Sequence, residues 1–523
     1  MKGGIMEIWT GDFPKLKRES KQAKTSNCII TLDIETTSLF EYADGWRCFR
    51  PKRSPQEYAG IRRAAVPYIW MVGVETRSGD FRAYYGRDFM QLGDVFLKLS
   101  DTRRRIIYIH NAAFEFQFLR DVFTARGWTI EKMLARSTRK PISWYVPEIN
   151  IEFRCSYMLT NLSLDKAAKQ YAKDRKKTGD LIYTVPRSPA TELTEKELGY
   201  CEMDVITLCE IIDHYRRQYG TVRKIPLTQT GEVRKELKGI VPIWVKRHIA
   251  KIVPDIHVYL LLMKAFQGGI THACYLYTDD VLKDILSGDM ASAYPAAMLT
   301  EKFPMGWWRS VPADIVESYN HKIWAVLYHV KLHNFRSKYI NHYILGSKAL
   351  SAKNLKYDNG RIIEGDMIEL VLTDVDYDII RECYDIESVE YVETYVNRKG
   401  YLPKELVEYV VTLYGRKTKL KGVKGQEHIY MISKQRINSL FGCCCTNVLK
   451  QTTIFKDGEW GNEDFTEEFI EEKLNELRKS QSNCFSYAWG VWITAYCRRR
   501  TWEIVTALDP AVVGIADGSV YYD

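Results

Sequence analysis

Residues 287–295 read SGDMASAYP, and this short stretch carries the strongest single signal in the sequence. The surrounding segment 286–298 predicts a strand, a tight turn and a helix, which places Asp289 at the end of the strand. A carboxylate there, together with the backbone carbonyl of Met290, offers two oxygens to one hard cation. The plain alternative is a strand–turn–helix unit that carries an unrelated aspartate.

A second polar segment, residues 434–442, reads KQRINSLFG and lies in a range, 404–440, that predicts mainly helix. Lys434 and Asn438 are four residues apart, so they share one face of that helix. A lysine on an exposed helix face offers a point charge for a phosphate group.

Further acidic residues occur in the first half of the chain. Residues 28–33, CIITLD, form a buried-strand pattern, and we expect Asp33 and Glu35 at its end, on one face. Glu115, Tyr200 and Asp204 lie on predicted helices, and Tyr200 and Asp204 are one helical turn apart. The set comprises Asp33, Glu35, Glu115, Tyr200 and Asp204. Each residue alone is consistent with a solvated surface group.

The sequence around these residues predicts a mixed α/β domain that ends near residue 220. Strands are predicted over 68–75 and 106–110, and helices over 111–123, 164–171 and 194–215. The last helix opens with Thr194 and Glu197 at the spacing of a capping box.

Composition narrows the class of protein. The 523 residues predict three to four domains at about 150 residues each. Hydrophobic residues make up 46% and charged residues 27%, which excludes a disordered chain and a fibre. No apolar run reaches about 18 residues and no signal peptide is evident, so we expect no membrane partner. The twelve cysteines lack paired CxxC spacing, which favours reduced thiols in a cytosolic compartment.

The net charge of +9 is mild for this length, but basic residues are clustered. A protein that neutralises phosphates along a groove needs such clusters, so they favour a polyanionic partner. The clusters span residues 103–105, 173–177, 416–424 and 498–500.

The order of the acidic motifs resembles the 3′–5′ proofreading exonuclease domain of family B DNA polymerases. The motifs are DxE at Asp33 and Glu35, NxxFE ending at Glu115, and YxxxD from Tyr200 to Asp204. The resemblance implies a ribonuclease H-like domain in which four carboxylates hold two Mg²⁺ ions. Glu115 departs from the family pattern, which has the shorter aspartate.

The same resemblance implies roles for other residues. Tyr200 would orient the attacking water, Asn111 and Phe114 would hold a single-stranded 3′ end, and Lys177 would lie near the scissile phosphate. A core phenylalanine is the alternative for Phe114, and a plain basic loop is the alternative for Lys177.

Residues 287–295 resemble the first polymerase motif of family B, DxxSLYP, and residues 434–442 resemble the second, KxxxNSxYG. The resemblance implies that Asp289 and the carbonyl of Met290 bind a metal ion. It places Tyr294 under the incoming sugar, where the ring leaves no room for a 2′-hydroxyl.

For the second motif, the resemblance implies that Lys434 binds the triphosphate and that Asn438 faces the nucleotide and the nascent base pair. Phe441 replaces the usual tyrosine and Ala293 replaces the usual leucine of the first motif. Lys421 or Lys424 would assist at the phosphates.

Three features resemble the protein-primed bacteriophage branch of this family. Gly268 and Gly269, in the stretch FQGG, resemble the YxGG element between the two domains, where backbone can approach DNA closely. Segments 371–385 and 489–496 also resemble this branch. The resemblance therefore implies a terminal priming protein as a partner.

The implied fold class is an α/β and α+β multidomain protein, with a ribonuclease H-like exonuclease domain followed by a family B palm and fingers. The expected domains are a basic arm (1–27), the exonuclease (28–220), a linker and palm start (221–285), palm motif A (286–300), a terminal-protein-contacting insertion (301–400), fingers (401–442), a second insertion for strand displacement and processivity (443–487), and palm with a degenerate third motif (488–523).

The third polymerase motif, DTDS in the family, reads GIADGSVYYD here and has one aspartate at the turn, Asp517. Asp517 is either the metal-binding second aspartate of the motif, or the first, in which case Ser519 or a deletion replaces the ligand. The family continues into a thumb, and we expect this chain to extend DNA poorly unless another chain supplies one.

The sequence thus predicts a phage DNA-directed DNA polymerase with 3′–5′ exonuclease proofreading. Its expected ligands are DNA, dNTPs and two Mg²⁺ per active site, with Mn²⁺ as a substitute, in the cytoplasm of an infected bacterial host. One alternative is a 3′–5′ exonuclease with an inactive polymerase remnant. The other is a non-catalytic half of a split polymerase that binds DNA or terminal protein.

Overall fold

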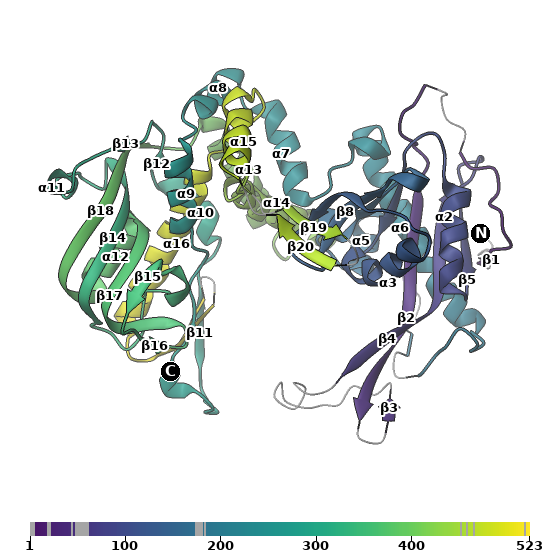
Figure 1. Cartoon of the computed structure of the whole chain (residues 1–523), viewed down its shortest axis with the longest axis horizontal. Helices are drawn as coiled ribbons and strands as arrows, with labels where there is room; N and C mark the ends of the chain where they lie inside the picture. Colours follow the sequence, from purple (N-terminus) through teal and green to yellow (C-terminus); the bar gives the residue numbers. More distant parts are fainter. Residues whose placement is uncertain are drawn as a thin grey trace. The chain divides into compact units, whose positions relative to one another are not determined.

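The computed structural model describes residues 6–17, 22–42, 45–47, 62–172, 181–182, 185–449, 452–456, 459–463, 466–516 and 519–522. The chain divides into two compact units (Figure 1). The first unit comprises Met1–Glu232 and Gln451–Asp464, and the second comprises Val233–Lys450 and Phe465–Asp523. The first unit therefore includes a short segment from far along the sequence. The finer domain boundaries stay predictions.

A nine-stranded sheet forms the centre of the first unit, in the order β1-β5-β4-β2-β6-β9-β8-β7, with β3 attached to β2. The strands are β1 (Glu7–Ile8), β2 (Ile30–Tyr42), β3 (Gly45–Arg47), β4 (Arg63–Glu75), β5 (Phe81–Gly86), β6 (Arg105–Ile109), β7 (Glu131–Ala135), β8 (Pro141–Val146) and β9 (Ile151–Cys155). β2 pairs antiparallel with β4 and parallel with β6. This mixed sheet confirms the predicted α/β character.

Helices cover both faces of this sheet. They are α2 (Leu92–Leu99), α3 (Ala112–Ala125), α4 (Tyr157–Thr160), α5 (Leu164–Tyr171) and α6 (Glu195–Tyr219). Leu32 and Ile34 of β2 pack into the core that contains residues of α2 and α3. Thr31 faces the other way, and its Oγ1 donates a hydrogen bond to the carbonyl of Val205 on α6 at 3.0 Å. Because side chains alternate along a strand, the odd-numbered residues that follow Thr31 also face α6.

α6 begins with the predicted capping box. The backbone N–H of Glu197 donates to Thr194 Oγ1 at 3.3 Å, and the backbone N–H of Thr194 donates to the Glu197 carboxylate at 2.8 Å. The reciprocal bonds satisfy two backbone donors at the start of the helix. The helix that carries Tyr200 and Asp204 is therefore fixed at its first turn.

The second unit contains two sheets. The smaller is fully antiparallel, in the order β10-β21-β22-β11, and consists of β10 (Thr271–Ala273), β11 (Leu286–Asp289), β21 (Val512–Ala516) and β22 (Ser519–Tyr522). The larger has the path β12-β18-β14-β17-β15 with β13 and β16 attached. Its strands are β12 (Phe303–Pro304), β13 (Arg309–Ser310), β14 (Trp324–Ser337), β15 (Ser351–Lys353), β16 (Lys356–Asp358), β17 (Arg361–Thr373) and β18 (Tyr384–Gly400).

The second unit contains more helices than the sequence pattern predicted. They are α7 (Gln229–Ile240), which crosses the unit boundary, α8 (Ile243–Lys251), α9 (Ile256–Ala265), α10 (Ala293–Thr300), α11 (Ala313–Val316), α12 (Asp374–Cys383), α13 (Lys404–Leu420), α14 (Glu427–Cys444), α15 (Glu467–Lys479) and α16 (Tyr487–Leu508). The predicted helical range 404–440 forms two helices, α13 and α14. A two-stranded hairpin, β19 (Thr452–Lys456) and β20 (Glu459–Glu463), belongs to the first unit.

A buried ion pair fixes the Gly268 segment in the second unit. Arg498 on α16 and Asp376 on α12 lie 2.8 Å apart, with side chains that are 0% and 5% exposed. The Arg498 guanidinium also donates to the carbonyls of Gln267 and Gly268, the latter at 2.9 Å. Tyr343 donates its hydroxyl proton to Asp376 at 2.5 Å. The charged pair thus links two helices to the loop before β10.

We expect Asp376→Ala to lower the free energy of unfolding of the second unit by about 3–5 kcal/mol, because it leaves the Arg498 guanidinium buried without its counter-charge. Denaturant unfolding monitored by tryptophan fluorescence measures the change. The matched control is Glu503→Ala, which removes an exposed partner of Arg499 at 3.1 Å and should cost under about 1 kcal/mol. Equal costs for the two variants would contradict a structural role for the buried pair.

Two candidate active sites

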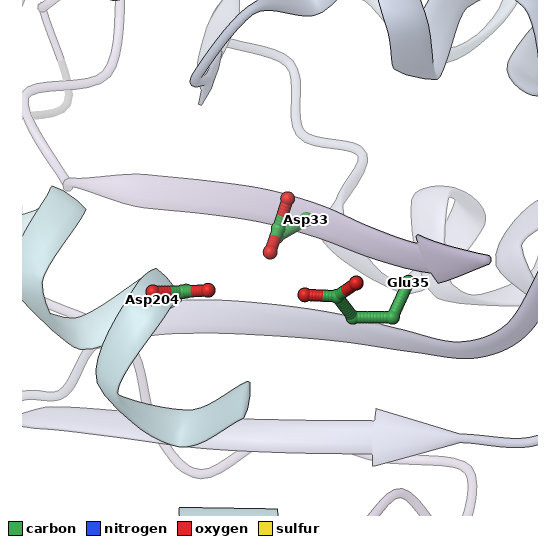
Figure 2. A group of neighbouring side chains, drawn as sticks. All are labelled: Asp33, Glu35 and Asp204. Carbon is green, nitrogen blue, oxygen red and sulfur yellow. The ribbon is translucent and has the colours of Figure 1, made fainter. Parts of the chain in front are cut away.

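Three carboxylates converge in the first unit. Asp33 and Glu35 extend from β2 and Asp204 extends from α6, and one ligand oxygen from each lies within 4.8 Å of the others (Figure 2). The alternation along β2 explains this arrangement, because Asp33 and Glu35 occupy the strand face that packs against α6. Such a group of oxygen ligands suits a divalent cation.

The position of the DxE motif corrects one expectation. Asp33 and Glu35 lie inside β2, which continues to Tyr42, and not at a strand end. The pairing of β2 with β4 shifts register between Glu35 and Thr36. In this bulge Glu35 pairs with Ile69 and Thr36 pairs with Pro67, so the extra residue lies in β4 and not in β2. The sequence pattern of a short apolar strand did not contain this irregularity.

Glu115, at the start of α3, is a buried carboxylate that lines the same cavity, whose volume is about 330 Å³. Glu115 is only 3% exposed, and its Oε2 has no hydrogen-bond partner among the described residues. Burial raises the pKa of Glu115 well above its usual value, and the charge of Asp33 adds to the rise. A buried carboxylate oxygen without a hydrogen bond is costly unless a cation compensates it. Glu115 lies outside the tight group of three.

The other predicted residues of this site have different positions. Tyr200 is buried and lines the cavity one helical turn before Asp204. Phe114 also lines it, is 38% exposed, and contacts Phe118 edge-to-face at 5.2 Å. Asn111 precedes α3 in the left-handed conformation (φ 69°) and is exposed. Lys177 lies outside the described residues.

His110 lines the cavity and was not predicted from the sequence. It follows β6 directly and precedes Asn111. Its Nδ1 lies 3.0 Å from Ser156 Oγ. Its place beside the NxxFE motif was the only signal, and a lone histidine at a strand end is not specific.

The second unit presents Asp289 at the end of β11, as predicted from the sequence. The whole of β11 is exposed. Asp289 pairs with Ser519 of β22, and Ser519 Oγ donates to Asp289 Oδ1 at 3.2 Å. Asp517 lies outside the described residues, between the paired ends Ala516 and Ser519 in the sequence.

An aromatic stack joins the first two polymerase-like motifs. The rings of Tyr294 and Phe441 are 3.9 Å apart and inclined by 8°. Phenylalanine at 441 therefore keeps the ring surface that this contact requires. Lys434 and Asn438 are both exposed on α14, at the spacing that puts them on one face.

Lys417 is a further basic residue of this site. Its Nζ donates to Ser292 Oγ at 2.6 Å, in the turn that follows Asp289. Burial lowers the pKa of Lys417, the charges of Lys434 and Lys421 lower it further, and Asp289 acts in the opposite direction. Lys417 belongs to the basic run noted in the sequence, but the family resemblance pointed to Lys421 or Lys424 within that run.

Gly268 and Gly269 lie in the loop before β10, the first strand of the smaller sheet. Gly268 is exposed, and a Cβ at that position would meet no atom within 4 Å. The open space leaves its backbone accessible. Within the described residues, no helix combines the length and apolarity needed to cross a membrane.

Comparison with known proteins identifies the class of protein to which this chain belongs. A family model described as DNA polymerase type B, organellar and viral, matches residues 177–501. Because the match covers more than half of the chain, this protein belongs to the organellar and viral type B DNA polymerases.

Curated relatives come from bacteriophages. The DNA polymerase of Bacillus phage Nf is 24% identical over 423 residues, which cover 76% of this chain and 67% of the relative. The DNA polymerase of Bacillus phage phi29 is 22% identical over 364 residues, which cover 65% of this chain and 59% of the relative. The findings identify a phage-type DNA-directed DNA polymerase and do not favour the two alternative functions.

Solved structures show the same fold. Phi29 DNA polymerase in an orthorhombic crystal form aligns with a TM-score of 0.66 at 17% identity, covering 95% of this chain and 80% of the other. The same polymerase complexed with primer-template DNA gives the same score, identity and coverage. The predicted multidomain fold class is thereby confirmed. Use of a divalent metal is general in this family.

Proposed function

We propose that the chain replicates phage DNA by adding nucleotides at a site around Asp289 and removes 3′-terminal nucleotides at a site around Asp33, Glu35 and Asp204. The observation that carries the proposal is the group of three carboxylates within 4.8 Å, beside the buried Glu115, in a polymerase family member. Side chains that repel one another so closely, with no hydrogen bond on Glu115 Oε2, fit a site made for cations.

The cations are proposed to be Mg²⁺, two per active site, with Mn²⁺ as a substitute. They would be held by Asp33, Glu35, Glu115 and Asp204 in the first unit, and by Asp289, the carbonyl of Met290 and Asp517 in the second. When bound, they supply Lewis-acid activation of a nucleophile and neutralise charge on the phosphate undergoing substitution.

In the exonuclease reaction, Tyr200 is proposed to orient the attacking water. Phe114 offers an exposed ring face on which a terminal base can stack, and Asn111 offers an amide to the same 3′ end. Lys177 is proposed to neutralise the scissile phosphate. These roles are supported by the positions of Tyr200 and Phe114 in the lining of one cavity.

In the polymerase reaction, Lys434 and Lys417 are proposed to hold the triphosphate of a dNTP. Asn438 faces the nucleotide and base pair, and Tyr294 blocks the 2′ position of the sugar. The stack of Tyr294 on Phe441 supports this role, because a ring held parallel at 3.9 Å has little freedom to move aside. The backbone at Gly268 and Gly269 is proposed to approach the template.

The proposed partners are primer-template DNA, single-stranded 3′ ends, dNTPs and a terminal priming protein that contacts residues 301–400. Solved structures of phi29 DNA polymerase with primer-template DNA and with incoming nucleotides support the first of these partners and the dNTPs. The phage origin of the relatives supports replication in the cytoplasm of an infected bacterial host.

We expect the purified chain with Mg²⁺ to add one nucleotide to a 5′-labelled primer-template when only the next complementary dNTP is present, and to shorten the primer when dNTPs are absent. Single-nucleotide addition is the suitable measurement because it does not require processive movement. EDTA should stop both reactions. A chain that neither lengthens nor shortens the primer with Mg²⁺ or Mn²⁺ would contradict the proposed function.

A further inference from the structure

The hairpin β19–β20 packs into the first unit although its sequence neighbours on both sides belong to the second (Figure 1). Phe455 and Trp460 are partners across the hairpin, with ring centroids 5.3 Å apart. Both rings pack against Phe116 of α3, each at a centroid distance of 5.4 Å. The hairpin therefore contributes two aromatic side chains to the core of the first unit.

Phe116 is enclosed by these contacts. Trp144 of β8, which is fully buried, lies against another part of the Phe116 ring at 4.9 Å and 75°. We call Phe116, Trp144, Phe455 and Trp460 the aromatic anchor. Two of its four members come from the hairpin, so Phe116 has all three of these aromatic contacts only when the hairpin is packed against it.

The anchor adjoins the exonuclease site through the backbone of α3. Glu115 precedes Phe116, and consecutive helical residues point about 100° apart around the axis. A displacement of the α3 backbone at Phe116 also displaces Glu115, the adjacent residue of the same helical turn. No hydrogen bond within the described residues holds Glu115 Oε2 in place, so its position depends on how α3 packs in the first unit.

We propose that Phe455 and Trp460 are positioning residues for the exonuclease site, which hold the first turn of α3 so that Glu115 faces the carboxylates of Asp33, Glu35 and Asp204. The inference rests on the proposed exonuclease function of that site. It implies that residues 1–232 alone do not form the complete exonuclease, because the hairpin supplies part of its core.

The test uses the full chain with Trp460→Ala, and it has a readout that needs neither metal nor activity. In EDTA, we expect the backbone amides of the first turns of α3 to exchange hydrogen at least about tenfold faster than in the unchanged protein. We expect the Mg²⁺ concentration that gives half-maximal nucleotide release from a single-stranded oligonucleotide to rise about 10–100-fold. Loss of a residue that orients a metal ligand has an effect of this size.

Three variants separate positioning from general destabilisation. Trp460→Phe keeps an aromatic ring and should restore both readouts to near the unchanged values. Phe455→Leu keeps apolar bulk without the ring and should shift both readouts in the same direction, so it serves if Trp460→Ala does not fold. Trp9→Ala removes a buried ring of the same core that packs on Phe13 and Trp70, and it should leave the Mg²⁺ dependence unchanged.

Unchanged exchange in α3 in both Trp460→Ala and Phe455→Leu would overturn the inference, as would a Trp9→Ala variant with the same Mg²⁺ shift as Trp460→Ala. If the unchanged chain releases no nucleotides, the proposed exonuclease function fails. The exchange measurement would still report whether the hairpin positions α3.

Discussion

Asp204→Asn is expected to reduce 3′ nucleotide release by about a thousandfold, the loss that accompanies removal of about 4 kcal/mol of transition-state stabilisation. The substitution keeps the shape of the side chain on α6 but removes one of the three charges that lie within 4.8 Å. Release of nucleotides from a 5′-labelled single-stranded oligonucleotide in Mg²⁺ measures the effect. Nucleotide addition by the second unit should persist.

A second readout distinguishes loss of cation binding from damage to the fold. Without a cation, the carboxylates of Asp33, Glu35 and Asp204 repel one another, so Asp204→Asn should raise the melting temperature in EDTA. It should also reduce the further rise that Mg²⁺ produces in the unchanged chain. A variant with lower stability in EDTA and a normal response to Mg²⁺ would not fit an electrostatic site.

The matched control is Glu195→Gln on the same helix. Glu195 is exposed in the first turn of α6 and undergoes the same change of charge. We expect its rate of nucleotide release to stay within about twofold of the unchanged chain, since surface substitutions of this kind have small effects. Normal release by Asp204→Asn would remove the main support for the exonuclease assignment.

Local sequence determined much of the first site. The period of a strand predicts that Asp33 and Glu35 share a face, and the period of a helix predicts the same for Tyr200 and Asp204. The capping box at Thr194 marked the start of α6 to the residue. These features were predictable because each depends on residues that are close in sequence.

Features that depend on distant partners were not predictable in this way. The sequence around Phe455 and Trp460 does not indicate that both rings pack against Phe116 of α3. The range 443–487 is accordingly divided, with β19–β20 in the first unit and α15 in the second.

Lys417 illustrates the same limit within the second site. Several lysines in the run 416–424 are equivalent by charge and spacing. Only the packing of α13 selects the one whose Nζ reaches Ser292 Oγ beside Asp289. The bulge after Glu35 is similar, because it follows from how β2 pairs with β4 and not from the residues of β2 alone.

Asp289→Asn is expected to reduce single-nucleotide addition by about a thousandfold while release of nucleotides at the 3′ end continues. Asp289 is an exposed carboxylate at the end of β11, close enough to Lys417 to influence its pKa. The lysines Lys417, Lys421 and Lys434 bring positive charge to the same place. The negative charge of Asp289 favours a cation at a place where these lysines disfavour one.

The charge balance explains why the effect should be large. With Asp289 neutralised, the site keeps its lysines and can still attract a triphosphate, so nucleotide binding should weaken less than the rate of addition. The expected result is a fall in kcat with a modest change in KM, which indicates an interaction made mainly in the transition state. Steady-state addition of one dNTP to excess primer-template measures both quantities.

Asp284→Asn is the matched control, because Asp284 is an exposed aspartate five residues earlier in the same segment. It should retain normal addition. Retention by Asp289→Asn as well would show that nucleotide transfer occurs elsewhere or not at all. Loss of addition with intact release, set against the opposite pattern in Asp204→Asn, requires two separate sites, because a shared defect in folding or DNA binding would reduce both reactions together.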